Sequence, residues 1–239
     1  MEKIVLSPPM SNLQIFSPSH SGKTTRILGT YTLKKRRGLW RVLTTLKRVE
    51  GGWLNNVGLR NGGIHSIPNK RAIISISSLE DQDWYALVEE IKSKPKVIGV
   101  ELNISCPNAE VNQLPSDLLG EMNHSFQNVI VKAPHICTLD YLLRLVDMGV
   151  KTIHISNTKK TVEGALSGKS LVERNLQTIR DLKVLRPSVK VIGGGGIYDL
   201  DSLLRYEDVG ADYFSLSTVL FNPLRSRKLI KDYYERSLT

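Results

Sequence analysis

From residue 72 onward, short β-branched runs alternate strictly with segments of helical periodicity, and this alternation limits the fold more than any other feature. The runs predict strands over 72–77, 97–105, 128–133, 151–158, 189–196 and 211–218. The segments between and after them predict helices over 81–93, 115–126, 138–149, 170–185, 199–210 and 223–238. Apolar strands that alternate with helices are parallel strands covered by helices, so the class is α/β.

Two earlier runs, over 13–18 and 27–33, predict two further strands and bring the total to eight. Eight such strands favour a closed (β/α)8 TIM barrel, with an open doubly wound sheet as the alternative. Only residues 19–26 separate the first two strands, so the first β/α unit is shortened and lacks its helix. No linker, repeat or low-complexity stretch divides the chain, which predicts a single domain over 1–239.

The chain is basic, with 33 Lys and Arg against 23 Asp and Glu, and the excess gathers over 34–48 and 225–231. A nucleic-acid or anionic-lipid surface is one interpretation, and a solvated basic face is the other. The second is favoured because no aromatic residues alternate with the charges as a stacking platform requires. No apolar run approaches the ~18 residues of a membrane span. Two cysteines make no disulfide framework, which predicts a reducing, cytoplasmic location.

Polar and small residues gather at the predicted carboxyl ends of the strands, where barrels place their active sites. Amides carry both donors and an acceptor, so several together suit a small planar ligand, although each alone could be a turn residue. A lysine at a strand end places an ammonium in the barrel mouth, unless it reaches out to solvent. The residues at these ends are Ser21, Gly22, Asn55, Asn103, Asn108, Lys132, Asn157, Ser217, Thr218 and the glycines 193–196.

The four glycines at 193–196 follow a predicted strand and precede a predicted helix. Backbone N–H groups in such a turn can bind a phosphate, helped by the positive end of the helix dipole. Ser217 and Thr218 end the next strand and could add donors to the same anion. The alternative is a tight turn that needs glycine, but four in succession exceed that need, which favours a phosphate site.

Cys106 lies in the sequence ELNISCPN, residues 101–108, between two asparagines. A thiol with an ordinary pKa of about 8.5 can act as a base when its surroundings favour the thiolate. Free cysteines are more often small buried hydrophobes. That second interpretation suits Cys137, whereas the Ser, Pro and Asn around Cys106 favour a reactive role.

Several motifs in order resemble those of the dihydroorotate dehydrogenases, flavin enzymes of pyrimidine synthesis built on an FMN-binding barrel. ELNISCPN resembles the signature loop of the family. The resemblance extends over nearly the whole chain, through GTYTLKKRRG (29–38), GWLNNVGLRNGGI (52–64), VKAP (131–134), ISNT (155–158), GALSGKSL (164–171), VIGGGGI (191–197) and FSLSTVLF (214–221).

The resemblance implies FMN as cofactor, dihydroorotate or a similar small cyclic molecule as substrate, no metal and a possible homodimer. Cys106 would be the general base that removes a proton while hydride passes to the flavin, as in the soluble class of the family. Asn55, Asn103, Asn108 and Asn157 would hold the substrate. The residues implied around FMN are Ser21, Gly22, Lys132, Gly168, Gly195, Gly196, Ser217 and Thr218.

Two departures keep other functions open. The family normally has a lysine in its second strand, where this chain has Gly29, and the chain is shorter than typical members. A non-catalytic or altered-substrate flavin-binding relative is therefore one alternative. The tRNA-dihydrouridine synthases, which are also FMN barrels with a Cys-Pro loop, are another. They carry glycine where this chain has Ser105 and an added RNA-binding domain, so a nucleic-acid partner is not expected.

Overall fold

Eight parallel strands close into a barrel in the order β1-β12-β11-β8-β7-β6-β5-β2. The computed structural model describes residues 1–12, 23–36, 46–55, 58–80, 82–104, 114–156 and 158–236. The predicted closed barrel is confirmed, and the open sheet is excluded. The barrel strands are β1 (Ile4–Leu6), β2 (Thr24–Tyr31), β5 (Ala72–Ile76), β6 (Val97–Asn103), β7 (Val129–Lys132), β8 (Thr152–Ile155), β11 (Lys190–Gly194) and β12 (Tyr213–Leu216).

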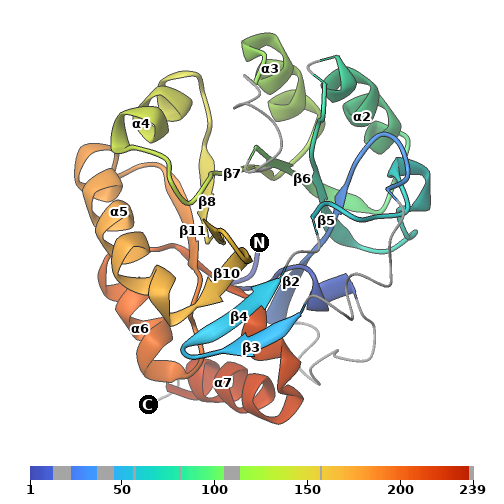
Figure 1. Cartoon of the computed structure of the whole chain (residues 1–239). Helices are drawn as coiled ribbons and strands as arrows, with labels where there is room; N and C mark the ends of the chain where they lie inside the picture. Colours follow the sequence, from blue (N-terminus) through green and yellow to red (C-terminus); the bar gives the residue numbers. More distant parts are fainter. Residues whose placement is uncertain are drawn as a thin grey trace.

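The α-helices of the described residues surround the barrel, one after each of its last six strands (Figure 1). They are α2 (Asp83–Lys92), α3 (Ser116–Ser125), α4 (Leu139–Asp147), α5 (Val172–Leu185), α6 (Leu200–Asp208) and α7 (Pro223–Glu235). After β1 and β2, the described part of the chain has only the short 3-10 helices η1 (Met10–Asn12) and η4 (Ile64–Ser66). Among these described residues, no helix has the length and apolar character needed to cross a membrane.

The first barrel strand lies nearer the N-terminus than the sequence pattern predicts. The strand expected over 13–18 falls outside the described residues, and Ile4–Leu6 takes the first place in the barrel instead. Ile4 pairs with Phe214 of β12 on one side and with Thr24 of β2 on the other. Three residues are enough to close the barrel, but they are too few to show the periodicity by which a strand is recognised.

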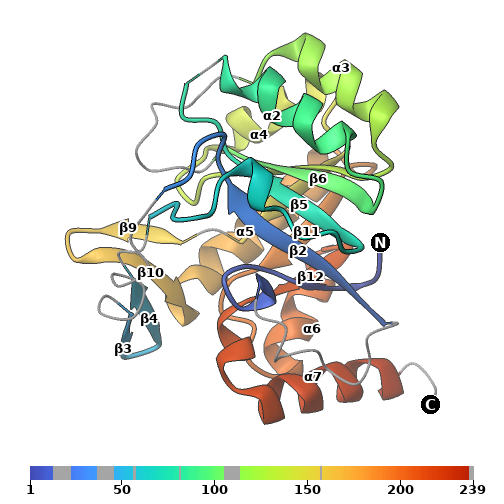
Figure 2. The ribbon, with the colours of Figure 1, turned by 90° about the vertical axis from the view of Figure 1, so that its right-hand side faces the viewer.

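A second sheet lies at the carboxyl end of the barrel. It is antiparallel, in the order β3-β4-β10-β9, and Figure 2 shows it at the opposite end of the molecule from the N-terminus. The sequence pattern does not predict it, although Val-Glu-Gly stands at the turn of both hairpins, 49–51 and 162–164, and is a usable turn signal. Its strands are β3 (Lys47–Val49), β4 (Gly52–Asn55), β9 (Lys159–Thr161) and β10 (Gly164–Gly168).

The barrel interior changes from apolar to polar along its strands. Near the amino ends, five buried side chains form a separate apolar cluster: Val5, Ile27, Ile73, Ile130 and Ile192. Two residues further along, the chain points to the same side again, and the positions there are small or polar. Glu101 pairs with Ser75 in the sheet, and His154 pairs with Lys132. We call all of these positions together the polar layer: Ser7, Gly29, Ser75, Glu101, Lys132, His154 and Gly194.

Candidate active site

A buried carboxylate and a buried imidazole form the centre of the polar layer. Glu101 of β6 is 1% exposed and His154 of β8 is fully buried. The Glu101 Oε2 atom lies 2.6 Å from His154 Nδ1. The other ring nitrogen, Nε2, lies 2.5 Å from the hydroxyl oxygen of Ser156, which directly follows β8 and is half-buried. A connected Glu-His-Ser series therefore rises from the barrel interior to its rim.

A second series of hydrogen bonds reaches the same carboxylate from the opposite side. The Ser75 hydroxyl donates to Glu101 Oε1 at 2.7 Å. The hydroxyl of Thr30 lies 3.0 Å from that of Ser75, and Asn103 Nδ2 donates to Thr30 Oγ1 at 2.9 Å. Asn103 ends β6, so this series also runs up to the rim.

The charges of the polar layer balance one another. Burial by itself would raise the pKa of Glu101, but His154, Lys132 and Ser75 outweigh burial and hold this pKa at about 2. Burial lowers the pKa of His154, against the opposing effect of Glu101. The carboxylate is therefore ionised and the imidazole neutral, and the Lys132 ammonium compensates the charge of Glu101.

The sheet register brings two predicted site residues together. Asn103 pairs with Lys132, and Lys132 pairs with His154, across three neighbouring strands. Glu101 and His154 are not among the residues predicted from the sequence, because that prediction considers only strand ends. Their signal was a polar residue inside an otherwise apolar strand, which is rare unless the residue is paired.

Asn55 and Gly168 lie in the second sheet, where the sequence pattern predicts loops. Asn55 ends β4, and its Nδ2 donates to the carbonyl of Ala165 in β10 at 3.2 Å. Gly168 ends β10 with φ 128, and a Cβ atom there would lie 2.3 Å from the carbonyl oxygen of Gly51. Only glycine allows this close approach of the two strands.

A cavity of about 420 Å³ lies between the second sheet and the residues that follow β11 and β12. Three of the residues predicted around FMN line it: Gly168, Gly196 and Thr218. Two cations, Arg48 and Lys169, line it as well. Backbone glycines with two cations form surroundings that attract an anion. Gly195 and Ser217 lie in the adjoining segments without lining the cavity.

Packing accounts for all four glycines at 193–196. A Cβ atom on Gly193 would lie 2.7 Å from Tyr206, and one on Gly194 would lie 2.8 Å from Ser215. Gly195 and Gly196 have φ values of 86 and 80, which glycine adopts without strain. The four glycines are therefore explained without a bound phosphate, and a phosphate site at this turn stays a prediction.

Asp199 caps helix α6 directly after the glycine turn. Its carboxylate accepts from the Ser202 N–H at 2.9 Å, and the Ser202 hydroxyl accepts from the Asp199 N–H at 3.0 Å. We expect Asp199→Ala to lower the free energy of unfolding by about 1 kcal/mol, measured by urea denaturation at pH 7. Asp208→Ala, at the exposed far end of α6, is the control and should leave it nearly unchanged. Equal losses in both variants would contradict the cap.

The remaining predicted site residues lie outside the described residues: Cys106, Asn108, Asn157, Ser21 and Gly22. Their roles stay predictions. The other cysteine, Cys137, is half-buried and packs against the hydrophobic core. Burial raises the pKa of its thiol to about 11, so this thiol stays protonated at neutral pH.

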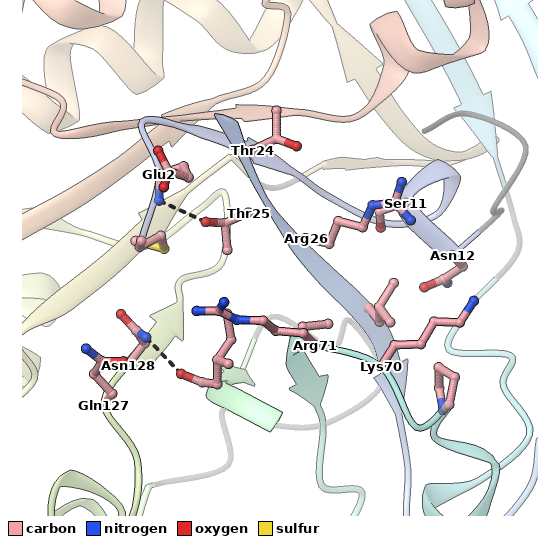
Figure 3. A pocket seen from close by; sticks show the side chains of 15 residues that line it. Glu2, Ser11, Asn12, Thr24, Thr25, Arg26, Lys70, Arg71, Gln127 and Asn128 are labelled. Carbon is pink, nitrogen blue, oxygen red and sulfur yellow. Dashed lines mark hydrogen bonds between the residues drawn. The ribbon is translucent and has the colours of Figure 1, made fainter. Parts of the chain in front are cut away.

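A second cavity, of about 470 Å³, lies at the other end of the barrel, beside the amino ends of β2, β5 and β6 (Figure 3). Three cations line it, Arg26, Lys70 and Arg71, against one acid, Glu2. In Figure 3 the Arg71 side chain reaches toward its centre. Because barrel chemistry belongs to the carboxyl end, this basic cavity is separate from the candidate active site.

Comparison with known proteins gives a consistent family. The model of the dihydroorotate dehydrogenase family matches residues 18–238. Dihydroorotate dehydrogenase A (fumarate) of Limosilactobacillus reuteri (strain DSM 20016) is 24% identical over 245 residues, covering 86% of this chain and 79% of that protein. The catalytic subunit of dihydroorotate dehydrogenase B (NAD(+)) of Bacillus cereus (strain AH187) is 24% identical over 206 residues, covering 72% of this chain and 66% of that subunit. The ligand-free DHODH structure from Eimeria tenella shares the fold, with a TM-score of 0.72 at 14% identity over 97% of this chain and 83% of that chain.

Proposed function

The chain belongs to the dihydroorotate dehydrogenase family, and we propose that it is an FMN-dependent oxidoreductase that oxidises dihydroorotate, or a similar small cyclic substrate, in pyrimidine synthesis. The observation that carries the proposal is the polar layer at the carboxyl end of the barrel, next to a cavity lined by two cations. Such an arrangement fits both ends of FMN, because the ring edge needs polar partners and the phosphate needs donors and positive charge.

The residues present fit FMN in two places. Lys169 and Arg48, with Gly168, Gly196 and Thr218, line the cavity that would hold the phosphate. Lys132 and Ser156, at the rim of β7 and β8, would meet the polar edge of the ring. Bound FMN would supply the acceptor for a hydride from the substrate.

Asparagine amides would orient the substrate, and Cys106 would take its proton. Asn103 is held by Thr30, so its amide is already fixed at the rim. We assign Asn55, Asn108 and Asn157 to the same task. Cys106, as thiolate, would accept the proton from the substrate carbon next to the one that gives up hydride.

The absorption spectrum of the purified protein tests the proposal. We expect a yellow protein with flavin bands, and bleaching of those bands when dihydroorotate is added without oxygen. A colourless protein that does not take up FMN would contradict the cofactor. A yellow protein that dihydroorotate does not bleach would contradict the substrate and favour the altered-substrate or non-catalytic relative. The family match favours a dehydrogenase over a tRNA-dihydrouridine synthase.

Lys169 is expected to contribute to FMN affinity. It lines the cavity and is exposed, so its charge acts on the phosphate through partly screened surroundings. We expect Lys169→Ala to weaken FMN binding about tenfold. The affinity is measured by titrating FMN with the apoprotein and following the quenching of flavin fluorescence on binding. Lys228→Ala is the matched control, because this exposed lysine of α7 pairs with Asp232 outside the cavity. Equal FMN affinity in wild type and Lys169→Ala would place the phosphate elsewhere.

A further inference from the structure

The charge of Glu101 fixes the direction of the hydrogen bonds in the polar layer. An ionised carboxylate only accepts, so Ser75 donates its hydroxyl and His154 donates its Nδ1–H. A neutral imidazole with its proton on Nδ1 offers an acceptor at Nε2. Ser156 therefore donates its hydroxyl to that nitrogen. Every donor in both series points toward Glu101.

The two series of hydrogen bonds differ in whether they can keep an added proton. The series through Ser75 and Thr30 contains only hydroxyls and an amide, none of which keeps an added proton near neutral pH. The series through His154 contains a base with an ordinary pKa of about 6.5. Its proton on Nε2 would be stabilised by Glu101, 2.6 Å from the other ring nitrogen. Ser156 is the half-buried member of this series and gives it access to the rim.

We propose that Ser156, His154 and Glu101 form a proton relay through which the barrel takes up one proton when negative charge is placed on its rim. The inference rests on the proposed function, because two-electron reduction of bound FMN would place that charge there. A proton from solvent bonds to the Ser156 oxygen, and the former hydroxyl proton of Ser156 moves to His154 Nε2. The resulting imidazolium keeps its Nδ1–H on Glu101. No electrons are transferred in this step.

The balance of charge explains why the relay takes up a proton when negative charge appears at the rim. Before that charge is added, Lys132 compensates Glu101 and His154 is neutral. The added negative charge therefore has no counter-charge within the polar layer. Coulomb attraction in this buried setting raises the proton affinity of His154. Two charged groups act on His154: Glu101 from β6 favours its protonation, and Lys132 from β7 opposes it. Ile192, its sheet partner in β11, is apolar.

The number of protons taken up per two electrons tests the relay. We would photoreduce the FMN-loaded protein between pH 7 and pH 8.5 and derive this number from the pH dependence of the midpoint potential. We expect two protons in the wild type and one in the double variant Glu101→Gln/His154→Gln. The double variant is chosen because it removes both members of the buried Glu101–His154 pair together, so that neither is left without its partner. His124→Gln, at an exposed position of helix α3, is the control and should behave as wild type.

A second measurement keeps the test decisive if the double variant does not fold. The ring signals of His154 in the NMR spectrum of the wild type should move from neutral to imidazolium positions when FMN is reduced. Unchanged ring signals, or equal proton uptake in wild type and double variant, would overturn the relay and leave the proposed function intact. A wild type that does not bind FMN would overturn the proposed function itself.

Discussion

Replacing Cys106 with alanine is expected to slow the reduction of bound FMN by dihydroorotate by roughly 10²–10⁴-fold, the range that a positioned general base contributes. The substrate would still bind, but its proton would pass to water or to a poorly placed group. FMN affinity should not change, because the cations and glycines proposed to hold the phosphate are untouched. Anaerobic stopped-flow mixing, with flavin bleaching as the signal, measures the rate.

The second cysteine provides the matched control for this experiment. Cys137 is half-buried against the hydrophobic core and has a raised pKa, so Cys137→Ala should reduce flavin at the wild-type rate. Cys106→Ser should fall between wild type and Cys106→Ala, because a hydroxyl can accept a proton but is far less acidic than a thiol. An unchanged rate of flavin reduction in Cys106→Ala would mean that Cys106 is not the general base, and would favour the non-catalytic relative.

The barrel could be predicted from sequence because an amphipathic helix follows each of its last six strands, and the periodicities of strand and helix differ. β1 could not, because Ile4–Leu6 is too short to show any period and one of the two strands it pairs with, β12, lies more than 200 residues away. The second sheet could not be predicted from sequence for another reason. Its strands are half-exposed hairpins whose pattern is weak, and only their Val-Glu-Gly turns give a local signal.

The candidate site was predictable where it depends on strand ends. Asn103 and Lys132 end neighbouring strands, so a parallel register must bring them together. Glu101 and His154 lie inside their strands, and their partnership depends on the order in which β6, β7 and β8 follow one another round the barrel. A polar residue in a buried strand needs a partner, so either residue alone indicates a polar barrel interior.

Glu101→Ala is expected to lower the free energy of unfolding at pH 7 by about 3 kcal/mol, because a carboxylate whose pKa is held at about 2 in the folded state contributes about that much at neutral pH. His154 would lose the acceptor for its Nδ1–H, and Lys132 would lose its compensating charge. Urea denaturation measures the loss. Glu173→Ala is the control, because its surface pair with Arg205 is exposed and should contribute no more than about 1 kcal/mol. Equal losses would contradict a structural role for the buried carboxylate.

The pH dependence of that loss separates charge from packing. The folded-state pKa of Glu101, about 2, lies below the ordinary value of about 4.3. A lowered pKa contributes stability that is fully present above the unfolded-state pKa and is lost as the pH falls toward the folded-state value. The difference in stability between wild type and Glu101→Ala should therefore be constant above about pH 5 and shrink as the pH falls below about 4. A difference that stays constant down to pH 3 would mean that Glu101 stabilises the barrel by its volume alone.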